Sequence, residues 1–259
     1  MFLGVNIDHI AVLREARKIN DPDPMDAVSL LKRAGANQIT IHLREDRRHM
    51  NDKDAQKIIE NSPLPVNMEC SINPDIIDIV IKLNPHRVTL VPEKREEVTT
   101  EGGLDVAKYK NEIALIAKRL EYHHIELSLF IDPTTEGIRD TKEVGAQWVE
   151  LHTGLYANIY AMLHTNMSKT HHCIKELDID RTSLHVMLKK SLRELHESAK
   201  YANTLGLRVA AGHGLNYQNV KSIVDMSEIE ELNIGQSIIA RSIFTGFETA
   251  VKDMLELVR

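Results

Sequence analysis

The sequence has 259 residues and a formal net charge of -6, and its acidic and basic residues are interspersed. This balance argues against a general nucleic-acid or membrane-surface binder, although a few local arginines can still hold an anionic ligand. No Gly/Ser/Pro-rich linker divides the chain, so we expect residues 1–259 to form a single domain.

Two cysteines, Cys70 and Cys173, provide neither a disulfide framework nor metal-ligand spacing. The N-terminus enters a strand-like run at once, with no basic region and no long apolar run. We therefore expect neither a signal peptide nor a transmembrane span, and we expect a cytoplasmic protein.

Short β-branched apolar runs alternate with helical stretches along the chain. The expected strands lie at 2–7, 37–43, 64–70, 86–92, 125–131, 146–152, 207–212 and 229–235. Most of these runs read as continuously apolar, which is typical of strands covered on both faces. Eight such units favour an α/β fold with a closed (β/α)8 TIM barrel, which typically takes about 250 residues.

Helix boundaries are readable between several of these strands. Asp23-Pro24 is an N-cap followed by proline in the first turn, and that helix is expected to stop at Gly35. Asn73-Pro74 starts another helix, and apolar spacing predicts further helices over 107–120 and about 183–205.

Two connections are too long to be simple turns. Residues 92–105 contain Thr99 and the pair Gly102-Gly103, and we expect this loop to be a mobile lid over an active face. The extended connection after the sixth strand, 153–182, is rich in polar residues and is expected to be a solvated insertion. Its run His171-His172-Cys173 is poorly spaced for one chelating site.

Residues able to do chemistry recur at the C-terminal ends of the expected strands, where barrel enzymes place their active sites. His42 suits a general acid or base, and Arg44 with His49 suits a phosphate. Glu69 ends the third strand, where burial would raise its pKa toward that of a useful base. Glu150 and His152 end the sixth strand, and the sequence leaves open which of the two faces the mouth.

Glycine turns follow the seventh and eighth strands. One is Gly212-His213-Gly214, and the other is Gly235, which opens into a helix. Loops at these two positions of a barrel frequently hold a phosphate on backbone amides at a helix N-terminus.

Several motifs together resemble the pyridoxine 5′-phosphate synthase family from the first strand to the last. They are Gly4–Ile10, His42–His49, Val91–Gly103, Leu129–Asp132, Glu150–Gly154, Ala211–Leu215 and Glu231–Gly235. The resemblance implies a (β/α)8 barrel of the transferase class that acts in vitamin B6 biosynthesis. It implies condensation of 1-deoxy-D-xylulose 5-phosphate with 3-amino-2-oxopropyl phosphate to pyridoxine 5′-phosphate, inorganic phosphate and water. It further implies no metal or organic cofactor and a homo-octamer.

The resemblance also implies roles for single residues. His42 and Glu69 correspond to proton acceptors, His213 to a proton donor and Glu150 to a transition-state stabiliser. The contacts for the aminoketone phosphate correspond to Asn6, Arg17, Gly214, Gly235 and Gln236. The contacts for the deoxyxylulose phosphate correspond to Asp8, His9, Arg44, His49 and Thr99. Gln236 departs from the family pattern, in which a histidine commonly follows this glycine, and Gln236 cannot carry a positive charge.

Two other functions remain open from the sequence. A metal-dependent barrel hydrolase or epimerase is one, because strand-end side chains could bind Zn²⁺. Its ligands would be His42, Glu69, His152 and His213. The other is a non-catalytic barrel that binds a phosphorylated metabolite, for which a complete set of acid–base groups would be superfluous.

Overall fold

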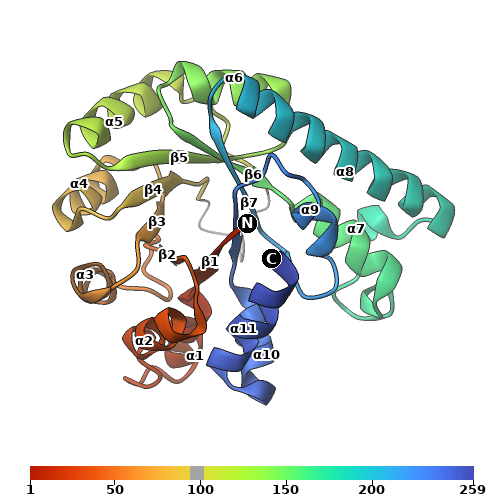
Figure 1. The fold of residues 1–259 in the computed structure, drawn as a ribbon, viewed down its shortest axis with the longest axis horizontal. Helices are drawn as coiled ribbons and strands as arrows, with labels where there is room; N and C mark the ends of the chain where they lie inside the picture. The colour runs from red at the N-terminus through yellow and green to blue at the C-terminus, as the bar shows by residue number, and fades with distance from the viewer. Residues whose placement is uncertain (94–101) are drawn as a thin grey trace.

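A computed structural model describes residues 1–93 and 102–259. In this part of the chain, eight parallel strands close into a barrel in sequence order, each pairing with the next and the last with the first (Figure 1). The strands are β1 (Phe2–Asn6), β2 (Gln38–His42), β3 (Val66–Cys70), β4 (Arg87–Leu90), β5 (Glu126–Ile131), β6 (Trp148–His152), β7 (Arg208–Gly212) and β8 (Glu231–Ile234). The predicted (β/α)8 barrel is confirmed.

Helices surround the barrel (Figure 1). They are α1 (Asp8–Arg17), α2 (Pro24–Ala34), α3 (Asp52–Asn61), α4 (Pro74–Leu83), α5 (Lys110–Tyr122), α6 (Thr135–Glu143), α7 (Gly154–His164), α8 (Arg181–Thr204), α9 (Lys221–Val224), α10 (Gln236–Thr245) and α11 (Phe247–Val258). The predicted boundaries of α2 are confirmed, because Asp23 accepts a hydrogen bond from Met25 N and Gly35 takes the left-handed C-cap conformation. Helix α5 begins later than predicted, after a turn over 106–109.

The expectation of continuously apolar strands is wrong, because the strands alternate. In β2, Ile39 and Ile41 belong to the apolar core, whereas Gln38 and Thr40 make side-chain hydrogen bonds to β8, two strands away. Side chains of β2 and β8 can meet only inside the barrel, since β1 lies between the two strands. Ile39 and Ile41 of β2 therefore point outward toward the helices, whereas Gln38 and Thr40 fill the interior.

An ionic layer closes the interior toward the N-terminal ends of the strands. Arg87 on β4 reaches Glu231 on β8 with Nη1–Oε1 and Nη2–Oε2 distances of 2.9 and 3.1 Å. Gln38 joins both partners through its amide, at 2.9 Å to each. The Arg87 guanidinium also lies 3.8 Å from the ring centroid of Trp148. These four side chains come from alternate strands, as the layers of a barrel interior do.

A second polar layer lies above this ionic layer. Thr40 Oγ1 donates to Asn233 Oδ1 at 3.0 Å, and Asn233 Nδ2 donates to Glu150 Oε2 at 2.8 Å. Glycines on neighbouring strands make room for these groups. A Cβ at Gly4 would lie 2.2 Å from Asn233 Oδ1, and one at Gly212 would lie 2.4 Å from Glu150 Oε1.

The extended connection after β6 is confirmed, but the expectation that it is a solvated insertion is wrong for its first part. Residues 154–164 form α7, which packs against the long helix α8 at the side of the barrel (Figure 1). Ile159 and Leu163 of α7 join Leu177 and Leu184 in a second apolar cluster. Only the segment between α7 and α8 is polar, and His171 and His172 are exposed there.

The predicted lid falls largely on residues 94–101, which include Thr99 and lie outside the described residues. The C-terminal end of this loop is closely packed from Gly103 onward. Leu104 N donates to Phe130 O at 2.8 Å, and a Cβ at Gly103 would lie 2.1 Å from the backbone nitrogen of Asp132. Gly103 is therefore required for close backbone packing against the end of β5.

Over the described ranges, none of the helices combines the length and the apolar character that crossing a membrane requires.

We predict that Arg87→Met lowers the free energy of unfolding by about 3–5 kcal/mol, because it leaves the Glu231 carboxylate buried without its cation. Urea unfolding followed by circular dichroism measures this change. Arg33→Met is the matched control, since Arg33 forms an exposed pair with Glu248 and its loss should cost less than about 1 kcal/mol. Equal effects of the two substitutions would show that the ionic layer does not support the barrel.

Candidate active site

A cavity of about 310 Å³ opens at the C-terminal ends of the strands. It is lined by Asn6, His9, Glu69, Val91, Phe130, Glu150, His213, Gly214, Leu215, Asn216, Asn233, Ile234, Gly235 and Gln236. Eight of the predicted site residues are therefore brought together here, from strands β1, β3 and β6, from the first turns of α1 and α10, and from the turns after β7 and β8. His42 stands beside them at the end of β2.

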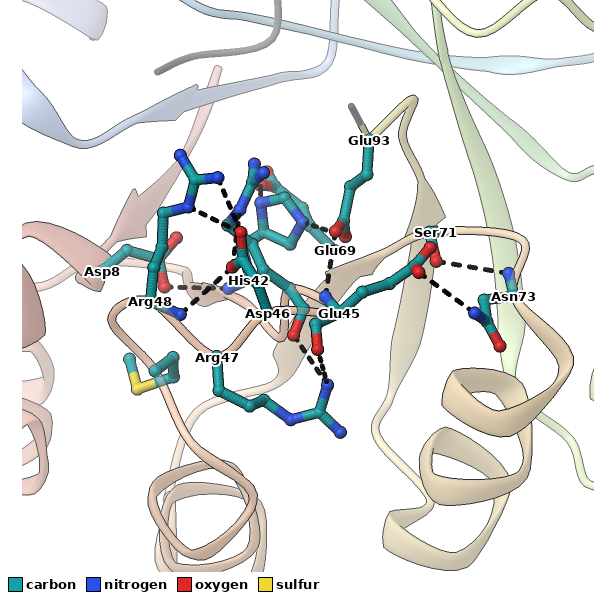
Figure 2. Close-up of polar contacts among 12 residues, drawn as sticks. Asp8, His42, Glu45, Asp46, Arg47, Arg48, Glu69, Ser71, Asn73 and Glu93 are labelled. Carbon is teal, nitrogen blue, oxygen red and sulfur yellow. Dashed lines mark hydrogen bonds and ion pairs between the residues drawn. The ribbon is translucent and has the colours of Figure 1, made fainter. Parts of the chain in front are cut away.

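His42 is held in place by two carboxylates, Asp8 and Glu93 (Figure 2). Asp8 Oδ1 accepts a hydrogen bond from His42 N at 2.8 Å, and His42 Nε2 donates to Glu93 Oε1 at 2.8 Å. The other ring nitrogen, Nδ1, faces Glu69 Oε2 at 3.8 Å. The ring therefore connects the fixed carboxylate of Glu93 with Glu69, which lines the cavity.

Glu93 is a member of this site that the sequence reading did not single out. Burial acts to raise the pKa of Glu93, but the hydrogen bonds from His42 and from Glu45 N outweigh burial and lower it. A charged Glu93 keeps the Nε2 hydrogen of His42 directed away from the cavity. The only signal in the sequence was the position of Glu93 directly after the fourth strand.

Two carboxyl groups in the cavity have raised pKa values. Burial raises the pKa of Glu69 well above its ordinary value, and the carboxylates of Glu150, Asp8 and Glu93 add to this shift. Burial and the neighbouring Glu231 raise the pKa of Glu150 to about 7, although Asn233 and Arg87 act in the opposite direction. With a pKa of about 7, Glu150 exchanges protons readily near neutral pH, as general acids and bases must.

His213 occupies a strained turn after β7. Its φ angle is 81°, a left-handed conformation that few residues other than glycine adopt. Thr153 Oγ1 is 2.7 Å from Gly212 O and 2.6 Å from His213 O, so its hydroxyl anchors this turn. Burial lowers the pKa of His213 to about 4, and the neighbouring His152 contributes to this shift. Strain that the surroundings hold in place is common at functional sites.

Both polar residues of β6 face the inside of the barrel, which answers the question that the sequence left open. Glu150 bonds Asn233 deep in the interior, and His152 lies nearer the mouth. His152 Nδ1 is 3.0 Å from Asp132 Oδ1, at the end of β5. The His152 ring packs at 5.0 Å, centroid to centroid, from both Phe130 and His213.

Two groups of residues that are suited to bind an anion flank the cavity. On one side, α10 begins at Gln236, its N-cap Gly235 provides no side-chain cap, and Gly214 lies opposite. A Cβ at Gly235 would lie 2.9 Å from Asn6 O, so the backbone approaches closely there. Free backbone amides at a helix N-terminus favour a phosphate.

Arg44 and His49 form the second group, beside His42. The Arg44 side chain is buried, and its Nε lies 3.4 Å from Asp46 Oδ1. His49 Nδ1 accepts a hydrogen bond from Met50 N at 2.8 Å, so the neutral ring carries its hydrogen on Nε2. Burial lowers the pKa of His49. The centroids of the His42 and His49 rings are 6.0 Å apart, so this second group lies close to His42.

The ligand set expected for a metal enzyme is not gathered in one place. Within the described ranges, Asp8, His42 and His49 form the group whose ligand atoms lie within 4.8 Å of one another. This group fits a metal poorly, because Asp8 already accepts from His42 N and Asn6 Nδ2, and the Nδ1 lone pair of His49 is taken by Met50 N.

Two residues that were predicted to contact the substrates, Arg17 and Thr99, are not among the residues gathered at this cavity. Arg17 lies in the last turn of α1, where it is exposed and does not line the cavity. Thr99 lies outside the described residues. The roles of Arg17 and Thr99 stay predictions.

The chain is similar to known proteins over its whole length. The family model described as "Pyridoxal phosphate biosynthesis protein PdxJ" matches residues 3–259. A pyridoxine 5′-phosphate synthase of Aliarcobacter butzleri is 62% identical over 259 residues, which cover 100% of this chain and 99% of the relative. One of Nitratiruptor sp. is 64% identical over 258 residues, which cover 100% of this chain and 97% of the relative.

Solved structures with little sequence identity share the fold alone. A 4-hydroxy-2-oxoglutarate aldolase/2-deydro-3-deoxyphosphogluconate aldolase has a TM-score of 0.60 at 8% identity, covering 99% of this chain and 94% of that one. A phosphoribosyl anthranilate isomerase of Thermus thermophilus has a TM-score of 0.54 at 12% identity, covering 100% and 98%. The full-length match to the family model and the highly identical relatives show that this chain belongs to the pyridoxine 5′-phosphate synthase family, whose members are enzymes of vitamin B6 biosynthesis.

Proposed function

We propose that this barrel condenses 1-deoxy-D-xylulose 5-phosphate with 3-amino-2-oxopropyl phosphate to pyridoxine 5′-phosphate, releasing phosphate and water. The observation that carries the proposal is the convergence of Glu69, Glu150 and His213 on one cavity, with His42 beside Glu69. Imine formation, dehydration and ring closure each move protons, and these groups supply acids and bases within one small volume.

The two substrates carry two phosphates, which two anion sites accommodate. We assign the aminoketone phosphate to the side formed by Asn6, Gly214, Gly235 and Gln236, where backbone amides meet the helix start. We assign the deoxyxylulose phosphate to the side of Asp8, His9, Arg44 and His49, where a guanidinium supplies the positive charge. Gln236 donates a hydrogen bond to a phosphate but adds no charge.

Each acid–base group receives a role from its environment. Glu69 and His42 accept protons, since Glu69 is a stronger base once ionised and Glu93 fixes the Nε2 hydrogen of His42. His213 donates a proton, and a phosphate bound beside its ring favours the protonated form that the donation requires. Glu150 stabilises the transition state from deeper in the barrel, where Asn233 donates a hydrogen bond to its carboxyl group.

The remaining features of the proposal concern the whole protein. We propose that residues 1–259 form one catalytic domain that needs no metal or organic cofactor and works in the cytoplasm as a homo-octamer. An exposed apolar surface supports self-association: Leu13 on α1 and Ile243 and Phe244 on α10 are 47%, 67% and 88% exposed, and the two helices are in contact.

The direct test is to incubate the protein with both substrates and to measure pyridoxine 5′-phosphate and inorganic phosphate. We expect Glu69→Gln to lower kcat by roughly 10²–10⁴-fold, because an amide cannot accept the proton. Glu60→Gln, on the exposed face of α3, is the control and should leave kcat unchanged. A protein that binds both substrates without releasing phosphate would instead be the non-catalytic binding barrel.

We expect Arg44→Ala to weaken binding of the deoxyxylulose phosphate about ten- to a hundredfold, because a charge-assisted hydrogen bond is lost. Binding of the aminoketone phosphate should change little. Calorimetric titration with each substrate measures both affinities. Arg48→Ala is the matched control on the same loop, where the side chain of Arg48 is 34% exposed and pairs with Asp46. Equal weakening of both substrates by Arg44→Ala would contradict the assignment of the two phosphate sides.

The raised pKa of Glu150 predicts a pH-dependent stability. Because the folded-state pKa of about 7 exceeds the unfolded value, the contribution of Glu150 is fully present below the unfolded pKa and is lost as the pH rises through about 7. Urea unfolding measures the free energy of unfolding at pH 5 and at pH 8. Between these two pH values it should decrease less for Glu150→Gln than for the original chain, by roughly 2–4 kcal/mol. An unchanged decrease would mean that Glu150 is ionised in the folded protein at both pH values.

A further inference from the structure

Consecutive carbonyl oxygens in the turn after β7 accept hydrogen bonds from two buried side chains. Thr153 Oγ1 lies 2.6 Å from His213 O, and it also lies 2.7 Å from Gly212 O. Asn219 Nδ2 donates to Gly214 O at 3.1 Å. Thr153 and Asn219 are 0% and 1% exposed, so these hydrogen bonds are shielded from water. The peptides of this turn therefore have a fixed orientation.

The N–H groups of the same peptides are directed toward the candidate active-site cavity. In a trans peptide the carbonyl and the N–H point in opposite directions, so Gly214 N–H opposes His213 O and Leu215 N–H opposes Gly214 O. Gly214 and Leu215 line the cavity, whereas the two side-chain donors do not. Among the described residues, no hydrogen-bond acceptor is found for Gly214 N or Leu215 N. These two amides are therefore available to an anion in the cavity.

The cavity has little positive charge of its own with which to hold a phosphate. Over the described ranges, its lining includes neither lysine nor arginine. Burial lowers the pKa values of His9 and His213, which disfavours the charged forms of both rings. Gln236, at the start of α10, can donate a hydrogen bond but adds no charge. The attraction for an anion on this side therefore depends largely on peptide dipoles, and so on the direction in which each peptide points.

Helix α7 holds both side-chain donors in place. Thr153 is the N-cap residue of α7, but its hydroxyl makes no capping bond to the helix and is used on the turn instead. Tyr156 Oη on α7 donates to Asn219 O at 2.7 Å, where the segment that leads into α9 lies beside α7 (Figure 1). A Cβ at Gly214 would lie 2.6 Å from Ala157 Cβ, so the turn packs directly against this helix. The first part of the connection after β6 thus supports the turn after β7.

We propose that Thr153 and Asn219 are positioning residues that set the affinity of this side of the cavity for a phosphate group. Their hydrogen bonds keep the oxygens of His213 and Gly214 away from the anion and keep the amides of Gly214 and Leu215 directed toward it. Without these bonds a peptide can turn its oxygen toward the phosphate, and the partial negative charge of that oxygen repels the anion. This inference rests on the proposed function, since it takes the phosphate of the aminoketone substrate as the occupant.

The test is calorimetric titration with each substrate, and with inorganic phosphate added to protein that is saturated with 1-deoxy-D-xylulose 5-phosphate. We expect Thr153→Val to weaken binding of 3-amino-2-oxopropyl phosphate and of inorganic phosphate about three- to tenfold, because one neutral hydrogen bond is lost. Binding of 1-deoxy-D-xylulose 5-phosphate should stay unchanged, and Thr153→Ser, which keeps the hydroxyl, should keep the original affinities. Tyr160→Phe is the matched control, because Tyr160 Oη donates at 3.0 Å to Gln218 O, in the same loop but outside the turn.

A second variant tests the other donor. Asn219→Ala should weaken the same two ligands at least as much, and in turnover it should raise KM for 3-amino-2-oxopropyl phosphate while KM for 1-deoxy-D-xylulose 5-phosphate stays the same. Equal weakening of all three ligands, unchanged binding in both variants, or no binding of inorganic phosphate to the original chain would overturn the inference. A chain that binds the three ligands as expected but forms no pyridoxine 5′-phosphate would contradict the proposed function instead, so the two failures are distinguishable.

Discussion

The polar interior of the barrel is the constraint on which the site depends. Arg87 and Glu231, joined by Gln38, form an ion pair inside the barrel, toward the N-terminal ends of the strands. Its charges are too costly to separate in a medium of low polarity, so the geometry of that layer is fixed. Each layer above it is tied to the one below by strand register and by hydrogen bonds such as Asn233 to Glu150. The carboxyl groups at the mouth thus stand on rigid strands and do not depend on mobile loops.

The same interior sets the electrostatics of the mouth. Glu231 is compensated by Arg87, but its remaining field still raises the pKa of Glu150, and the charge of Glu150 in turn raises that of Glu69. Buried carboxylates so close together are not all ionised at once. A proton is therefore retained among these groups near neutral pH, close to where the condensation requires proton transfer. The stack of polar layers supports the site mechanically and also tunes its acid–base behaviour.

Much of this architecture was predictable from the sequence, because parallel strands place their C-terminal ends on one face. His42, Glu69, Glu150 and His213 each follow an apolar run, and the glycine at 235 opens into a helix as expected. The interior was misread, since alternation within runs of four to six residues is easily taken for continuous apolarity. The buried face of α7 was missed because the polar composition of 153–182 hides the few apolar residues that pack against α8.

Contacts between side chains of different strands and loops could not be predicted from the sequence. Nothing near Glu93 indicates that its carboxylate meets His42, fifty-one positions earlier, since that contact exists only once β2 and β4 are placed in the barrel. The pairing of His152 with Asp132 depends likewise on the register between β5 and β6. Arg17 illustrates the converse, because a residue near the site in sequence lies at an exposed helix end in the fold.

Among the described residues, the mouth carries little fixed positive charge for a site that we propose receives two phosphates. Burial lowers the pKa values of His9, His49 and His213, which disfavours the charged forms of these rings. A phosphate dianion beside such rings favours their protonated forms, because an opposite charge nearby stabilises the charged state. Substrate binding itself thus raises the proton affinity of the histidines. A mouth built in this way acquires its acids when the substrates that need them are bound.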